Sequence, residues 1–558
     1  MKNHSAMPSN PLVLPKLCGA DIELGNFVAG AGRGSSTGGE ASRALLAKIR
    51  GFPESRNNWL GIQWSIPSAP AFHGSSGGQT SSWASGWSSD PQDVGRRFLA
   101  GNGSCAYVDL DHNEVCLPEV VDAWDHLAAW HAMLRIVRTA LDEANEERDD
   151  DRRIQVLVNN SDGMGHSWGS HLNFLISRRT FDNIFRRKPH YLPWLASLQI
   201  ASILLTGQGK VGSENRKPSA RYQISQRADF FETLCGMQTT HDRPLVNARD
   251  EPHAGSSLAE DPTAGARLHV IFFDSALAHG SALLRVGVMQ LGLVLLELGC
   301  VNARLILDDP LEALQDFSRD PSLRATARLI GGERVTALEL LGAYLDEVKQ
   351  HQAAGEFAGV VPRAGELVAL WEDTLEKLSR RDWMSLAPRL DWVLKMLIVE
   401  RAMEQRPELD WSSPEIKLID HLYSSLNDEG LYRAYEAGGF IEKLVPAERI
   451  AHFVNNPPED TRAWTRAMLL RRAAREGVKV DLVDWDRITF KMHDRLGWPV
   501  YRTVAMDNPL AFTRRDSQPI FDGAATFTGL LDGLNSLSIP RHVSTPALQT
   551  PNQQEKVS

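Results

Sequence analysis

Two short acidic segments, far apart in the chain, place several carboxylates on expected β-strands. One contains Asp21 and Glu23, and the other contains Tyr107, Asp109 and Glu114. Because residues i and i+2 of a strand point to the same side, Asp21 and Glu23 share a face, and so do Tyr107 and Asp109. Burying carboxylates on a sheet is costly unless a cation or hydrogen bonds compensate. The pattern predicts a site for a hard divalent cation such as Mg²⁺, which also holds nucleotide phosphates. The alternative is that these are exposed carboxylates at sheet edges.

Length and composition narrow the class of protein. With 558 residues the chain is long enough for more than one domain, and its net charge of −10 favours neither nucleic acid nor an anionic membrane as a partner. The five cysteines are scattered without a C-x-x-C pair, which favours a reducing cytosol. We expect no signal peptide, since residues 1–10 are polar. The apolar stretch 282–298 contains three polar or charged residues, so we expect a buried or amphipathic helix and no membrane span.

The chain divides into tails, a main domain and a smaller unit. Residues 1–15 and 537–558 have the composition of disordered tails, and the Ser/Gly-rich stretch 65–92, which carries tryptophans, is expected to be a long mobile loop. Strands carrying acidic residues alternate with helices, which indicates an α+β protein. The break at Asn455–Pro458 separates residues 16–454 from a small unit at 455–536. Helices are predicted at 336–350, 367–378, 386–404 and 414–426.

Glycine-rich and arginine-rich segments add candidate binding groups. Residues 159–173 and 207–212 carry glycines that allow a backbone to approach phosphates closely, although a plain glycine turn explains them as well. Arginines alternate with carboxylates in 243–253 and continue at Arg267. Such runs suit recognition of carboxylate or phosphate, or form a surface salt-bridge network.

These segments together resemble a known family, the Pup ligases and depupylases of the bacterial proteasome pathway. Pup is a small protein modifier. The resemblance covers about residues 17–515, and it is closer to the depupylase branch because the stretch 65–92 stands where depupylases carry a long loop. The motifs that follow the family's order are 159–173, 207–212, 222–227, 247–253, 267–274, 410–414, 456–463 and Trp485-Asp486.

The resemblance implies a fold, cofactors and roles. The fold would be glutamine synthetase-like, that of the carboxylate–amine ligases, with an antiparallel sheet, packed helices and a small C-terminal domain. The cofactors would be ATP and Mg²⁺. Asp109 matches the catalytic aspartate and Trp485 a tryptophan that contacts ATP, while Arg227, Arg249 and Arg267 are expected to hold phosphate or the carboxylate of Pup. The implied metal ligands are Asp21, Glu23, Tyr107 and Glu114.

Three positions depart from the family pattern near the nucleotide. Cys105 replaces an arginine, Leu172 replaces a glutamate within a His-Glu-Asn motif, and Leu117 stands where ligases have threonine. One interpretation is a weakened metal and phosphate site. The other is that Asp111 or His112 replaces the missing ligand.

The implied activity is hydrolysis of the isopeptide bond between the C-terminal Glu of a Pup-like modifier and a substrate lysine, or deamidation of a C-terminal Gln. The alternatives are an ATP-dependent Pup–protein ligase and a catalytically impaired homologue that still binds the modifier. In each case we expect a cytoplasmic protein of the proteasome pathway.

Overall fold

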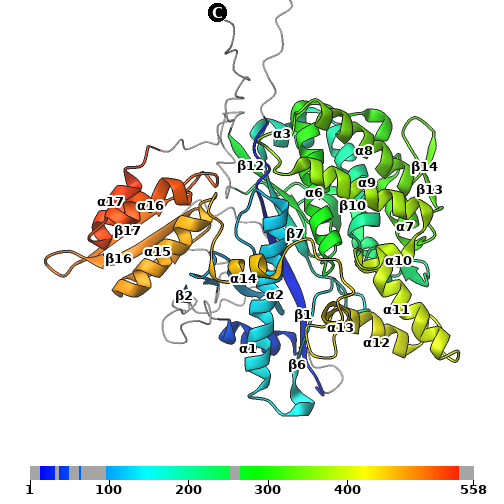
Figure 1. Cartoon of the computed structure of the whole chain (residues 1–558), viewed down its shortest axis with the longest axis horizontal. Coiled ribbons are helices and arrows are strands. Elements are labelled where there is room, and N and C mark those ends of the chain that lie inside the picture. Colours follow the sequence, from blue (N-terminus) through cyan, green and yellow to red (C-terminus); the bar gives the residue numbers. More distant parts are fainter. Residues whose placement is uncertain (1–12, 32–36, 50–61, 64–95, 252–263, 539–558) are drawn as a thin grey trace, which may run out of the picture.

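The computed structural model describes residues 13–31, 37–49, 62–63, 96–251 and 264–538 (Figure 1). The expected loop at 65–92 and most of both expected tails lie outside this range. Residues 13–15 and 537–538 of the expected tails are described, and among them Leu14 is fully buried, with its N–H donating to Glu297 Oε2 at 2.9 Å. Leu14 belongs to a small apolar cluster with Leu17 and Leu175, so packing against the main domain begins before residue 16.

A large antiparallel sheet forms the centre of the molecule (Figure 1). Its strand order is β12-β7-β1-β5-β4-β3-β2, and β6 pairs with the far end of β1. The expected α+β class with an antiparallel sheet is confirmed. The strands are β1 (Cys18–Val28), β2 (Ile62–Gln63), β3 (Arg97–Phe98), β4 (Cys105–Asp109), β5 (His112–Cys116), β6 (Ile154–Leu157), β7 (Ser170–Ser177) and β12 (Gly265–Val270).

The two faces of the sheet differ in chemistry because successive side chains of a strand alternate. On β1, Ala20, Ile22 and Leu24 are buried in the main apolar core, whereas Asp21 and Glu23 point to the other side. We call these the core face and the polar face of the sheet. The alternation of β1 thus separates packing from chemistry.

Helices cover the core face and extend to one side of the sheet, on the right in Figure 1. Short strands join some of them: β8 (Lys210–Val211), β9 (Tyr222–Gln223), β10 (Phe231–Gly236), β11 (Arg243–Asn247), β13 (Thr326–Arg328) and β14 (Arg334–Thr336). The helices are α1 (Gly38–Lys48), α2 (Ala123–Asn145), α3 (Arg178–Asp182), α4 (Tyr191–Ala201), α5 (Ile203–Thr206), α6 (His279–Leu298), α7 (Pro310–Arg319), α8 (Ala337–Ala353), α9 (Ala364–Arg380), α10 (Trp383–Leu386), α11 (Asp391–Gln405), α12 (Pro414–Tyr423), α13 (Leu431–Ala437) and α14 (Ala447–Asn455).

Helix α6 is the central helix of the core. It is long and apolar enough to cross a membrane, but 94% of its most apolar window is buried inside the protein. It packs against α2, β7 and α9. The expectation of a buried helix at 282–298 is confirmed.

A small C-terminal unit docks against the sheet near β4, drawn in orange and red in Figure 1. It comprises α15 (Ala463–Glu476), β15 (Lys479–Val483), β16 (Arg487–His493), β17 (Pro499–Ala505), α16 (Arg514–Gly523) and α17 (Phe527–Asn535). Its apolar core includes Phe98, Cys105 and Tyr107 of the large sheet. The two parts therefore share a continuous packed interface.

An ion cluster fixes this interface. Glu119, in the segment after β5, accepts hydrogen bonds from Arg462 Nε at 2.8 Å and from Arg466 Nη2 at 2.6 Å. All three side chains are buried. Burial opposes ionisation of Glu119, but the charges and hydrogen bonds of Arg466 and Arg462 lower the pKa of its carboxyl to about 2. The cluster is therefore charged at neutral pH.

Candidate active site

The polar face of the sheet carries a row of three side chains on adjacent strands. Antiparallel pairing places Glu23 of β1 opposite Glu114 of β5, and Glu114 opposite Tyr107 of β4. The Tyr107 hydroxyl donates to Glu114 Oε1 at 2.6 Å. Burial, and then the charge of Glu114, raise the pKa of Tyr107 well above its usual value, so it is a neutral phenol.

Asp109 joins this row to form an all-oxygen cluster. One carboxylate oxygen each from Glu23, Asp109 and Glu114 lie within 4.8 Å of one another. Burial, and then the charges of Asp21 and Glu23, raise the pKa of Glu114 well above its usual value, although the hydrogen bond from Tyr107 opposes this. Such crowding of one buried and two half-buried carboxylates fits a hard divalent cation, whose charge would offset the repulsion.

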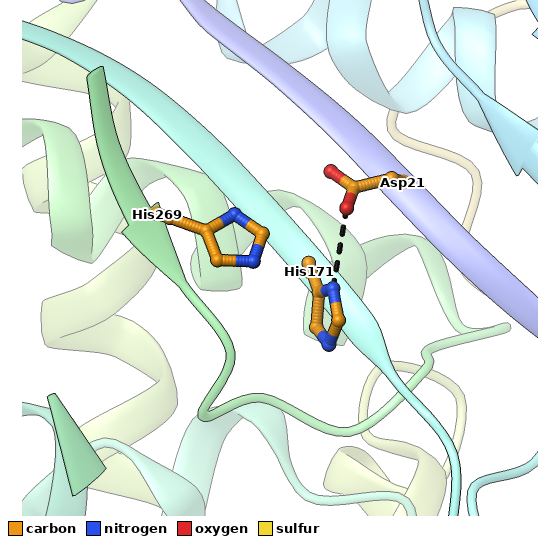
Figure 2. Close-up of side chains that lie close together, drawn as sticks. All are labelled: Asp21, His171 and His269. Carbon is orange, nitrogen blue, oxygen red and sulfur yellow. Dashed lines mark hydrogen bonds and ion pairs between the residues drawn. The ribbon is translucent and has the colours of Figure 1, made fainter. Parts of the chain in front are cut away.

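Asp21 does not belong to that cluster. Figure 2 shows it pointing toward His171 and His269, from three neighbouring strands. Its Oδ2 lies 3.2 Å from His171 Nδ1, and Asn173 Nδ2 donates to its Oδ1. The expectation of one metal set containing Asp21, Glu23, Tyr107 and Glu114 thus differs from the geometry, which shows two groups.

The second group has a different donor set, one carboxylate and two imidazoles within 4.8 Å. Burial opposes ionisation of Asp21, but the hydrogen bond from His171 and the charges of His269, His171 and Arg267 hold the pKa of its carboxyl well below its usual range. Burial, and then the charge of Arg267, hold the pKa of His269 well below its ordinary value. Neither His171 nor His269 was expected as a partner of Asp21. The signal available in the sequence was that each histidine lies in an apolar segment, 170–177 or 265–270, that predicts a strand.

The three arginines expected to bind phosphate or carboxylate lie in different places. Arg267 lines the cavity over the polar face, donates to Asn173 Oδ1 at 2.9 Å and pairs with Glu251. Arg249 also lines the cavity and is more exposed. Arg227 is fully buried outside the cavity lining, where its guanidinium donates to the backbone carbonyl of Ile271. Its position indicates a role in packing.

Trp485 reaches the cavity from the C-terminal unit. Its ring packs edge-on against Phe98 at a centroid distance of 5.2 Å. The Arg466 guanidinium lies over the same ring at 4.7 Å and donates to the Trp485 carbonyl at 3.0 Å. The ion cluster at Glu119 therefore also holds this aromatic side chain in place.

The departures from the family pattern have distinct structural outcomes. Leu172 is fully buried on the core face, so a glutamate there could not reach the polar face. The interpretation that Leu172 removes a metal ligand is wrong, because residues 171 and 173 are the ones that face Asp21. Cys105 packs in the interface core. Leu117 is buried and lines the cavity.

Asp111 and His112, the two possible replacement ligands, are the second residue of the turn between β4 and β5 and the first residue of β5. His112 lines the cavity, with its Nδ1 3.0 Å from the Leu24 carbonyl and its ring against Trp168. Asp111 is absent from the cavity lining and contacts the glycines at the start of α1. Of the two, His112 alone is placed to meet a ligand in the cavity.

A cavity of about 480 Å³ encloses both clusters. The polar face forms its floor, the glycine turn 165–169 one wall, and Trp485, Arg462 and Pro509 another. The turn is fixed: Gly165 N–H donates to Glu214 Oε1 at 3.0 Å, and Gly163 and Gly165 have φ of 75° and 104°. The volume suits a small molecule or the end of a peptide, but not a folded protein.

Comparison with known proteins matches this architecture. A family model described as "Pup-ligase protein" matches residues 44–489. The chain is 36% identical over 406 residues to a Pup deamidase/depupylase of Mycolicibacterium smegmatis, covering 72% of this chain and 77% of the relative. It is 33% identical over 415 residues to a Pup–protein ligase of Acidimicrobium ferrooxidans, covering 74% and 86%.

Solved structures show the same fold. The Pup ligase PafA in complex with ADP superposes with a TM-score of 0.66 at 26% identity, covering 76% of this chain and 89% of that chain. PafA in complex with Pup gives a TM-score of 0.69 at 23% identity, covering 89% and 90%. With the family model and relatives above 30% identity over most of their length, the chain belongs to the Pup-ligase family of enzymes.

Proposed function

We propose that this protein is a depupylase and Pup deamidase. It hydrolyses the isopeptide bond between the γ-carboxyl of the C-terminal Glu of a Pup-like modifier and a substrate lysine. It also hydrolyses the γ-amide of a modifier that ends in Gln, which releases ammonia. The observation that carries the proposal is the position of Asp109, which lies at the cavity floor beside Glu23 and Glu114. The depupylase name among relatives at 36% identity supports the hydrolytic direction.

Different residues of the cavity would bind the metal ion, the nucleotide base and the anionic groups. Glu23 and Glu114 would hold a magnesium ion, with Tyr107 fixing the orientation of Glu114. Trp485 would pack on the nucleotide base, and Arg249 and Arg267 would pair with phosphate or carboxylate. Magnesium, when bound, would supply the positive charge that holds the phosphates of ATP and polarises the scissile carbonyl.

Asp109 performs the chemical step. Its carboxylate either adds to the γ-carbonyl carbon, or takes a proton from a water that adds there. In both routes the C–N bond breaks, the amine leaves with a proton, and one water is consumed overall. A free γ-carboxylate of Glu and a free lysine amine, or ammonia, result. The reaction would take place in the cytoplasm on conjugates made by a ligase.

The test uses Asp109→Asn with a matched control. The variant should lose release of lysine from a Pup conjugate, followed by mass spectrometry, and should keep ATP binding. Asp346→Asn, which changes an exposed aspartate on α8, should behave as the parent. Wild-type hydrolysis by Asp109→Asn would remove Asp109 from the mechanism.

A ligase is the second candidate, because relatives at 33% identity are named Pup–protein ligase. In that case ATP would be consumed in step with conjugate formation, with a phosphorylated Pup glutamate as the expected activated form. Parent enzyme that joins Pup to lysine in proportion to ADP released, and that hydrolyses no conjugate, would establish the ligase. Parent enzyme without ATP binding or turnover would establish an impaired homologue.

A further inference from the structure

Leu110 occupies an unfavourable place for a leucine. It follows Asp109 directly and is the first residue of the two-residue turn that joins β4 to β5. Its φ is 50°, in the left-handed region, where tight hairpins favour glycine, asparagine or aspartate. Its side chain is 75% exposed. Both the backbone and the solvation of this side chain therefore disfavour leucine in the free protein.

Packing explains the positive φ of the other apolar residues with this backbone geometry in the described part of the chain, but not that of Leu110. Leu323 and Phe512 also have positive φ, of 61° and 55°, but each is 8% exposed and packs in an apolar core. The turn at Leu110 is also held from outside. The Asp111 carbonyl accepts hydrogen bonds from Ser42 Oγ at 2.6 Å and from Asn26 Nδ2 at 3.0 Å. The fold thus presents Leu110 in a fixed position.

That position is the mouth of the cavity. Leu110 lines the cavity yet is exposed, whereas the other leucines of the lining, Leu17, Leu117 and Leu175, are buried. A cavity of about 480 Å³ cannot admit a folded protein. The lysine of a conjugate must therefore reach Asp109 from outside, and its methylene stem must pass the mouth.

We propose that Leu110 contacts the aliphatic stem of the substrate lysine and so determines specificity for protein conjugates over the deamidation substrate. This inference rests on the proposed hydrolase function. A lysine stem is apolar up to the scissile nitrogen, and it would cover the exposed leucine next to the reacting aspartate. A modifier ending in Gln loses ammonia, which has no stem, so the contact acts on one leaving group alone.

The experiment compares two substrates with the same modifier and the same scissile γ-amide. One is a lysine isopeptide conjugate of Pup and the other is Pup ending in Gln. Leu110→Asn should lower the ratio of the two kcat/KM values, conjugate over Gln form, about tenfold, which corresponds to about 1.4 kcal/mol. Because asparagine tolerates positive φ, the Tm of the Leu110→Asn variant should not fall below that of the parent. Leu110→Met, which keeps an apolar side chain, should retain most of the parent's ratio of kcat/KM values.

Leu496→Asn is the matched control, because Leu496 is 83% exposed in the turn between β16 and β17 and is not part of the cavity lining. It should leave the ratio unchanged. An unchanged ratio in Leu110→Asn, or an equal shift in the Leu496 control, would overturn the contact while the hydrolase stands. A parent enzyme that hydrolyses neither substrate would overturn the hydrolase function, and the contact with it.

Discussion

The ion cluster at Glu119 offers a quantitative test of how the C-terminal unit is held. We consider Glu119→Gln, which keeps the size of the side chain but removes its charge. Two buried guanidiniums, Arg462 and Arg466, would then lose their ion pairs with Glu119. The pKa of Glu119 falls from an ordinary 4.5 to about 2 in the folded protein. At about 1.4 kcal/mol per pH unit, this interval corresponds to about 3 kcal/mol of stability at neutral pH.

A second estimate agrees. Removing one partner of a buried ion pair typically costs ~3–5 kcal/mol, because the remaining charge stays buried. Glu119→Gln should therefore lower the free energy of unfolding by about 3 kcal/mol at pH 7, measured by urea denaturation. Glu459→Gln breaks the pair with Arg514, in which both side chains are about half exposed, and should cost less than ~1 kcal/mol.

The pH dependence follows from the depressed pKa. The stabilisation by Glu119 is complete above about 4.5 and is lost as the pH falls through about 2. The stability difference between parent and Glu119→Gln should thus be constant from pH 5 to pH 8 and should narrow in acid. Because Arg466 also packs on Trp485, ATP binding should weaken in the variant. A variant as stable as the Glu459→Gln control, with unchanged ATP affinity, would refute this account.

Three further predictions concern the cavity. Trp485→Ala should weaken ATP binding by about 1–3 kcal/mol in calorimetry, by analogy with base–aromatic stacking; unchanged affinity would limit Trp485 to the interface core. Glu114→Gln should raise Tm in metal-free buffer, because it removes like-charge repulsion, and should abolish the Tm increase that Mg²⁺ gives the parent; an equal increase in both would exclude Glu114 as a ligand. Leu172→Glu should lower Tm sharply and bind Mg²⁺–ATP no better than the parent, because it buries a carboxylate on the core face; tighter binding would contradict this orientation.

Strand alternation predicted much of the cavity floor, because it depends only on local geometry. It correctly placed Tyr107 and Asp109 on one face, and Asp21 and Glu23 on one face. Applied to residues 171–173, the same rule places Leu172 on the face opposite His171 and Asn173. The sequence could not predict that Asp21 and Glu23 belong to different clusters, because this depends on the register of β1 with β7 and β5.

Burial and helix boundaries were harder to predict. Arg227 is of a residue type that often binds phosphate or carboxylate, but residues distant in sequence bury it. No local sequence pattern indicates that burial. The helix expected at 386–404 begins at Asp391, because Pro388 lacks the N–H that a helix interior needs and α10 ends before it. The expectation of a small C-terminal unit rests on the proline-containing segment 455–458. The ion cluster that docks this unit could not be expected, because it joins residues distant in sequence.

The contribution of Trp485 and Arg462 to the cavity has a consequence for synthesis on the ribosome. Asp109 emerges early, but Trp485 of the cavity wall lies 376 residues later. At about 5–20 residues per second, this interval lasts roughly 20 to 75 s. For most of that time the nascent chain lacks the cavity wall formed by Trp485 and Arg462, and Glu119 lacks its arginine partners. Under the proposed function, a chain that has not yet reached Trp485 would therefore lack its complete nucleotide site.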